Sequence, residues 1–190
     1  MLAAAAALAC AASASNAADQ EGNYALRGIG SASCTDYNAA LSGDAAQAQV
    51  FVSWMAGYIT ARSRTADDTF DVLPLVSGAD VAGLMRVICV QNEASTFEGA
   101  LDAAIRLFEP ARVRSDSPLL ELAHEGNRVA IRQATLVQVQ QALAAAGLYT
   151  AAVDGAYGPG TRSAISEFQR QNELPITGLP DADTLVALLL

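Results

Sequence analysis

Lysine is absent from the 190 residues, and all eleven basic residues are arginine, against twenty acidic residues. The formal net charge is −9, and the arginines form no basic cluster. A chain of this charge repels a phosphate backbone, so the composition argues against a nucleic-acid partner.

Motifs that carry chemistry are also missing. The sequence has no GxSxG, HExxH or phosphate-binding loop, and the one histidine, His124, has no CxxC or HxxxH spacing beside it. Two carboxylate pairs, Glu93 with Glu98 and Glu121 with Glu125, lie in polar stretches that we expect to be exposed. We therefore expect no catalytic residue, no metal and no cofactor, and we expect His124 to be a surface residue.

No hydrophobic run is long enough for a membrane span, which needs ~20 residues. Residues 2–12 are small and apolar and match the core of a secretory signal, with a small-x-small cleavage site before Ala18. No arginine precedes this run, and a disordered Ala-rich tail is the alternative. The sequence predicts a signal peptide over residues 1–18 and a periplasmic or secreted protein, with a lipoprotein anchored at Cys10 as a minor variant.

Cysteine is scarce. After removal of a signal peptide, Cys34 and Cys89 would remain, 55 positions apart. In an oxidising compartment an even pair favours a disulfide, and two buried thiols are the alternative.

Helical periodicity dominates the first half of the chain. Apolar residues recur at helical spacing over 45–62, 80–90 and 97–108, with Asp44 placed to cap the first of these helices. Residues 110–133 carry two prolines, a glycine and mixed charge, with a helical turn considered at 119–124. The fold class expected is all-α. The expected organisation is a signal peptide at 1–18, a flexible segment at 19–33, a disulfide-linked helical domain at 34–109, a linker at 110–133 and a three-helix domain at 134–190.

The last section contains a degenerate repeat with a constant offset of 23 residues. The paired positions are Val153 with Ile176, Gly155 with Gly178, Gly158 with Asp181, Thr161 with Thr184, and Ala164 with Ala187. A repeat of this kind predicts two similar loop–helix units packed together. Glycine suits the turn, Gly158-Pro159 and Asp181 suit helix starts, and Ile165 and Phe168 are expected to point into the core.

This section resembles the three-helix peptidoglycan-binding domain found in bacterial cell-wall hydrolases. The residues that carry the resemblance are Leu136, Val139, Gln140, Leu143, Gly147-Leu148-Tyr149, Val153-Asp154-Gly155-Ala156-Tyr157-Gly158-Pro159, Thr161, Ala164, Ile165, Phe168, Gln169, Leu174-Pro175, Thr177-Gly178, Asp181 and Thr184-Leu185. The resemblance implies a non-catalytic module that holds the peptide stem or glycan of peptidoglycan. The polar residues that the fold does not obviously need are the candidate ligand-binding residues: Asp154, Tyr157, Arg162, Gln169 and Arg170.

The helical domain at 34–109 is only loosely similar to small disulfide-bonded periplasmic proteins such as the acid-stress chaperones, and this similarity transfers no site residue. The function expected is an exported, non-catalytic peptidoglycan-binding protein that presents a helical domain. The alternative is a periplasmic partner-binding or chaperone-like protein whose C-terminal module is a scaffold. A cell-wall hydrolase with an unrecognised active site in the first half is a minor third possibility.

Overall fold

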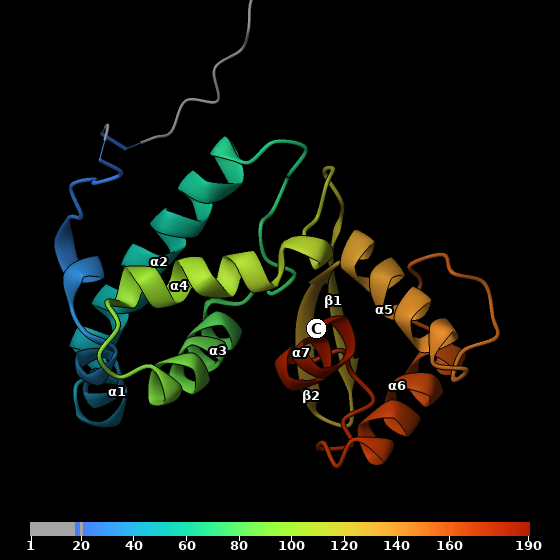
Figure 1. The fold of residues 1–190 in the computed structure, drawn as a ribbon. Helices are drawn as coiled ribbons and strands as arrows, with labels where there is room; N and C mark the ends of the chain where they lie inside the picture. Colours follow the sequence, from blue (N-terminus) through green and yellow to red (C-terminus); the bar gives the residue numbers. More distant parts are fainter. Residues whose placement is uncertain (1–17, 20) are drawn as a thin grey trace, which may run out of the picture.

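The computed structural model describes residues 18–19 and 21–190, so almost all of the expected signal peptide, with Cys10, lies outside the described residues. The described chain is mostly helical, with α1–α4 gathered on one side and α5–α7 on the other (Figure 1). The elements are the 3₁₀ helix Gly28–Ser31, α1 (Cys34–Gly43), α2 (Ala45–Thr65), α3 (Gly78–Gln91), α4 (Phe97–Leu107), the 3₁₀ helix Glu109–Ala111, β1 (Leu119–His124), β2 (Asn127–Arg132), α5 (Gln133–Ala145), α6 (Pro159–Gln171) and α7 (Ala182–Leu189).

Side-chain caps define where the first four helices begin. Ser33 and Asp36 form a reciprocal capping box on α1, and Asp44 accepts from the amide of Gln47 at the start of α2, as predicted. Behind these caps an aromatic cluster fills the core, with the ring centroids of Tyr37, Phe51 and Phe97 lying 4.7–5.1 Å apart. Local sequence therefore fixes the helix starts, and aromatic packing holds the helices together.

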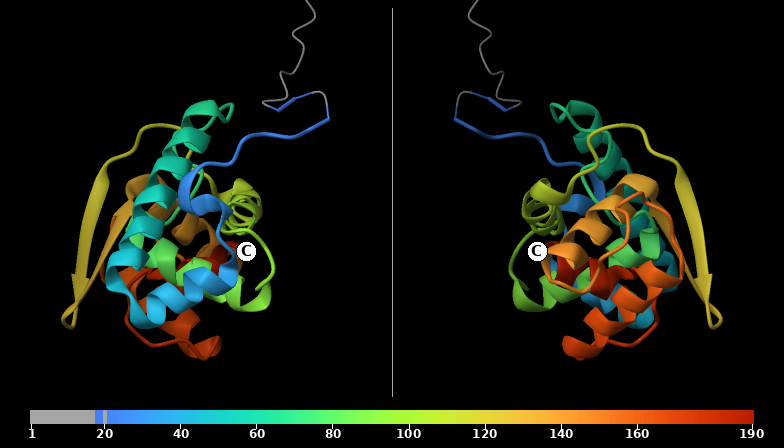
Figure 2. Two further views of the ribbon diagram at one scale, coloured as in Figure 1. Left: turned by 90° about the vertical axis from the view of Figure 1, so that its left-hand side faces the viewer. Right: turned by 90° about the vertical axis from the view of Figure 1, so that its right-hand side faces the viewer.

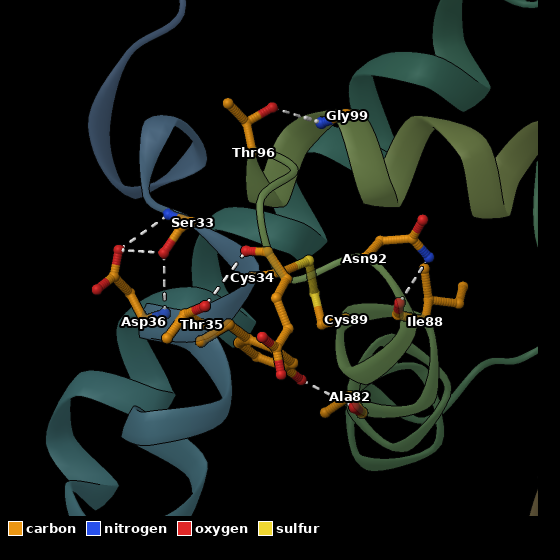
Figure 3. The surroundings of a disulfide bond; sticks show 12 residues. Ser33, Cys34, Thr35, Asp36, Ala82, Ile88, Cys89, Asn92, Thr96 and Gly99 are labelled. Carbon is orange, nitrogen blue, oxygen red and sulfur yellow. Dashed lines mark hydrogen bonds between the residues drawn. A yellow bond between two sulfur atoms is a disulfide. The ribbon is translucent and has the colours of Figure 1, made fainter.

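A disulfide joins Cys34 to Cys89 and confirms the expected pairing (Figure 3). It connects the first residue of α1 to the last turn of α3, and both cysteines are fully buried. Beside it, the amide of Cys34 donates to the carbonyl of Ser95 at 2.9 Å. The disulfide and this hydrogen bond together connect α1, α3 and the segment before α4 at one point.

Tyr37 gives this core a measurable pH dependence. Its hydroxyl donates to the carbonyl of Ala82 at 2.8 Å, and burial raises its pKa to about 12. A pKa raised in the folded state contributes stability that is full below the unfolded value near 10 and is lost as the pH rises towards 12. We expect Tyr37→Phe to be about 1 kcal/mol less stable than the wild type at pH 8.

That difference should shrink at pH 11, because phenylalanine cannot ionise. Guanidinium unfolding at both pH values measures it. The other tyrosines are common to both proteins, so only Tyr37 can change the difference in stability between them. An equal difference at pH 8 and pH 11 would therefore contradict a raised pKa for Tyr37.

The segment expected to be a linker contains an antiparallel β-hairpin, so the all-α expectation is only partly correct and a helical turn at 119–124 is wrong. Strands β1 and β2 pair from Leu119 with Arg132 to His124 with Asn127. Leu122 and Ile131 point to the core, while residues of the other face stay exposed or half-buried. The period-two burial of β1 is the pattern of a half-buried strand.

Glu125 and Gly126 close the hairpin as a two-residue turn with φ of +48° and +83°. Turns with two positive φ values favour Asn-Gly, and glutamate in the left-handed region is strained. We expect Glu125→Asn to raise the free energy of unfolding by about 0.5–1 kcal/mol. Thermal and urea unfolding measure the gain. The matched control, Glu121→Gln on the exposed face of β1, should leave stability within about 0.5 kcal/mol, and an equal gain in both variants would refute the strain.

The hairpin is held in place by hydrogen bonds at its open end. The amides of Gln133 and Ala134 donate to Pro118 and to the Ser117 hydroxyl, and Arg132 donates to the Ser117 carbonyl at 3.0 Å. The Arg132 guanidinium also lies over the ring of Phe70, 4.6 Å from its centroid. These contacts join the hairpin to the start of α5 and to the loop after α2, and the hairpin runs along one outer side of the molecule (Figure 2).

Helices α5–α7 form the two loop–helix units that the repeat predicted. Gly158 and Pro159 start α6, and Asp181 caps α7 by accepting from the amide of Thr184. Helix α7 contacts both α5 and α3, and the buried residues of the two helical groups form one connected cluster. No helix among the described residues is long and apolar enough to cross a bilayer.

Candidate functional site

Each unit of the repeat is organised around one buried glutamine. In the first unit the carbonyl oxygen of Gln140 accepts from the amides of Asp154 and Gly155 at 3.0 and 2.8 Å. Its amide nitrogen lies 3.0–3.3 Å from four oxygens, among them the Ala156 carbonyl and the Thr161 hydroxyl. A buried polar side chain is tolerated only when its hydrogen bonds are made, and here the loop after α5 and the first turn of α6 supply them.

Gln169 has the same place in the second unit. Its carbonyl oxygen accepts from the Gly178 amide at 2.9 Å, and its amide nitrogen lies 2.8–2.9 Å from oxygens of Thr177, Leu179 and Thr184. The contacted positions in the two loops are 23 residues apart, so the repeat is a repeat of hydrogen bonds as well as of sequence. Gly155 and Gly178 have φ of +70° and +68°, which aims their amides at the glutamines.

Gln169 therefore has a structural role. Its side chain is fully buried and presents no atom to solvent, although we had expected it to be a ligand-binding residue. Arg170, the next residue, is exposed and pairs with Glu167, which lowers the pKa of that carboxyl through a side-chain hydrogen bond. Of these two neighbours on α6, only Arg170 can meet a ligand.

The other three candidates lie around the two repeat loops. Asp154 is exposed, and its Oδ1 accepts from the Ala156 amide at 2.8 Å, a bond that lowers the pKa of the carboxyl. Tyr157 is half-buried and its hydroxyl donates to the carbonyl of Gly178 at 2.7 Å, so it joins one loop to the other. Arg162, on the first turn of α6, is also half-buried. Hydrogen bonds within the loops thus occupy Oδ1 of Asp154 and the hydroxyl of Tyr157, whereas the guanidinium of Arg162 remains available to bind a ligand.

A groove of about 470 Å³ crosses the exposed face of α6. The loop after α5 forms one wall, and Ile176, which is 57% exposed, forms the other. The lining residues are Leu148, Tyr149, Thr150, Ala151, Gly160, Ser163, Ala164, Ser166, Glu167, Arg170 and Ile176. Arg170 is the one residue of the predicted set that lines the groove.

The groove combines apolar walls with serine hydroxyls and an Arg–Glu pair. Ser163, Ser166 and Glu167 were not predicted, although their spacing of three and four residues marks one exposed helix face. An open, shallow surface with a few polar groups can hold an extended polymer or peptide, since such ligands are bound by shape and hydrogen bonds along their length.

The groove and the two repeat loops lie in a part of the chain that matches a known family. Residues 132–188 match the family model described as "Putative peptidoglycan binding domain". This confirms the resemblance, and the match begins two residues before the expected boundary at Ala134. The match supports a peptidoglycan partner for these residues, which we call the peptidoglycan-binding segment.

A curated protein of Synechococcus elongatus, named "Putative OxPP cycle protein OpcA", is 53% identical over 51 residues. The alignment covers 27% of this chain but only 12% of that protein, so the two share a short region. No solved structure gives a significant match to the chain.

Outside the peptidoglycan-binding segment, one carboxylate differs from expectation. Glu98 is only 5% exposed, although both carboxylate pairs were expected at the surface. Its two oxygens accept from the hydroxyls of Tyr24 and Tyr58 at 2.9 and 2.6 Å, and burial, with this bond, raises the pKa of Tyr58 to about 12. Each oxygen of Glu98 has its own donor, so the carboxylate is satisfied within the fold.

His124 is half-buried rather than fully exposed. It ends β1, and its Nε2 lies 3.8 Å from Oε1 of the exposed Glu125. Among the residues that the structure describes, no group of three histidine, cysteine, aspartate or glutamate side chains is placed to hold a metal ion.

Proposed function

We propose that this protein is exported and binds peptidoglycan non-catalytically through the α6 groove, with α1–α4 as a domain presented beside it. The observation that carries the proposal is the peptidoglycan-binding segment, whose family match coincides with the groove and its two supporting loops. The disulfide agrees with an oxidising compartment such as the periplasm.

The openness of the groove favours binding over chemistry. Its one close pair of charged groups, Glu167 with Arg170, is an ion pair at the surface rather than a carboxylate pair set around a scissile bond. Binding by shape and hydrogen bonds requires no nucleophile, and this matches the absence of catalytic motifs from the sequence.

Retention on purified sacculi tests the proposal. Full-length protein is expected to sediment with sacculi at 20 and 150 mM salt. Ser163→Trp would fill the groove floor, and we expect it to weaken retention about fivefold or more. Gln141→Trp places the same bulk on the exposed face of α5, away from the groove, and should be retained like the wild type. Wild-type protein that stays in the supernatant at both salt concentrations would reject the proposal.

A second function rests on the shared region with the Synechococcus protein. That relative is named for the OxPP cycle rather than for cell wall, so a stretch of sequence shared with this chain belongs to a protein named for another role. On this alternative the segment is a scaffold and the chain binds a protein partner. Crosslinking in cells distinguishes the two, because recovery of protein partners with no wall fragments would support the scaffold.

A further inference from the structure

Three elements meet at Gly178, which lies in the loop between α6 and α7. A Cβ atom at this position would lie 3.0 Å from Cγ of Arg162, 3.1 Å from Oγ of Ser166 and 3.1 Å from Cδ2 of His124. The hydroxyl of Tyr157 donates to the carbonyl of the same glycine. The absent side chain therefore lets a histidine of the hairpin and an arginine and a serine of α6 approach one another closely.

The charge at this cluster is unbalanced. In the part of the chain that the structure describes, most arginines with half-buried side chains form ion pairs with carboxylates, whereas Arg162 is half-buried and forms none. The nearest carboxylate to His124 is that of Glu125, which is 76% exposed and 3.8 Å away. A half-buried guanidinium without an acidic partner favours an anion supplied from outside.

The cluster continues the α6 groove. Ser166 lines the groove and also faces Gly178, and Ile176 forms the groove wall two residues before that glycine. A chain lying along the groove would therefore have one end beside Arg162. Peptide stems of peptidoglycan carry carboxylates, and a guanidinium binds a carboxylate through two parallel hydrogen bonds.

We propose that Arg162, Ser166 and His124 form a carboxylate-binding site at the edge of the α6 groove, a proposal that rests on the proposed function. The guanidinium of Arg162 donates two parallel hydrogen bonds to the carboxylate of the ligand, and the hydroxyl of Ser166 and a ring N–H of His124 are further donors to it. His124 precedes the peptidoglycan-binding segment, so the site takes one of its groups from a part of the chain that the family match does not include. The tight turn at Glu125 and Gly126 fixes the end of β1 and thereby the place of the histidine.

The test compares retention of full-length protein on untreated sacculi and on sacculi whose carboxyl groups have been converted to amides. Both the protein and untreated sacculi are negatively charged, so general electrostatics predicts that amidation strengthens retention. The carboxylate site predicts the opposite. On untreated sacculi we expect retention to fall about tenfold for Arg162→Gln and about threefold for His124→Gln, and on amidated sacculi both should match the wild type.

Three further variants separate the site from general charge effects, and two of them, Arg86→Gln and Glu121→Gln, are controls. Arg86→Gln on the exposed face of α3 should behave as the wild type. Glu125→Gln removes the carboxylate that competes for His124 and should improve retention about twofold, which a misfolded variant could not do, whereas Glu121→Gln on the same hairpin should not.

The outcomes separate the two proposals. Equal wild-type retention on both kinds of sacculi, with Arg162→Gln matching Arg86→Gln, would overturn the carboxylate site and leave wall binding standing. Retention on neither kind would overturn both.

Discussion

Replacing Gln169 by leucine is expected to lower the free energy of unfolding by about 4 kcal/mol. Leucine fills nearly the same volume but offers no hydrogen bonds to the second loop. The amide of Gly178 would then be buried without a partner, whereas the carbonyl of Leu179 and the hydroxyl of Thr184 would lose one hydrogen bond each and keep their bonds to Asp181. Burying an unsatisfied amide costs about 1–3 kcal/mol, and each of the other two lost hydrogen bonds costs about 0.5–1.5 kcal/mol.

Urea unfolding of the full-length protein followed by circular dichroism measures this loss. Gln171→Leu is the matched control, because Gln171 is exposed and its side chain donates a hydrogen bond to Glu167 at the surface of the same helix. We expect the control to stay within about 0.5 kcal/mol of the wild type. A loss below about 1 kcal/mol for Gln169→Leu would show that the glutamine is not the organising group of the unit.

Removing the disulfide is expected to have an effect of similar size. Cys34→Ala with Cys89→Ala opens a loop of 55 residues, and the chain-entropy account gives about 4 kcal/mol for a loop of that length. Native-state hydrogen exchange should show the loss first in α1 and α3, which the bond joins, and least in α6.

Reducing agent provides the internal control for the disulfide. It should destabilise the wild type to the level of the double variant and leave the double variant unchanged. Equal stability of the oxidised and reduced wild type would mean that packing around the aromatic cluster suffices without the covalent link.

Local chemistry explains which parts of the fold could be predicted. Asp44 and Asp181 cap helices by accepting from amides three residues later, and Gly158 precedes a proline at the first helical position, so their roles were visible in the sequence. The paired glycines Gly155 and Gly178 were visible for the same reason, because a positive φ is a property of one residue.

The residues whose positions were predicted wrongly depend on partners far away in the sequence. The buried Glu98 accepts hydrogen bonds from Tyr24 and Tyr58, 74 and 40 residues earlier, and His124 packs against Gly178, which lies in another loop. Gln169 looked like one more polar residue on the exposed side of α6, since its partners come from a loop that the helical pattern does not describe.

The β-hairpin was not predicted, although the sequence contains a signal for it. Val129 and Ile131 lie two positions apart between Arg128 and Arg132, and Gly126 marks a tight turn. The apolar run before the turn fits a helix as well as a strand, and its neighbouring prolines and charges favoured a linker.

The two glutamine-centred units differ in the length of chain they enclose. Fifteen positions separate Gln140 from Gly155, but only nine separate Gln169 from Gly178. Both glutamines accept from the glycine amide and donate to the equivalent carbonyl and threonine hydroxyl, so these shared bonds fix the turn and do not constrain the length of the segment before it. The longer segment includes Leu148–Ala151, one wall of the groove. Provided that the buried Tyr149, whose hydroxyl contacts Gln140, is kept, the rest of this wall can be lengthened or exchanged without removing a hydrogen bond of the glutamine, which makes it the place to introduce a new ligand preference.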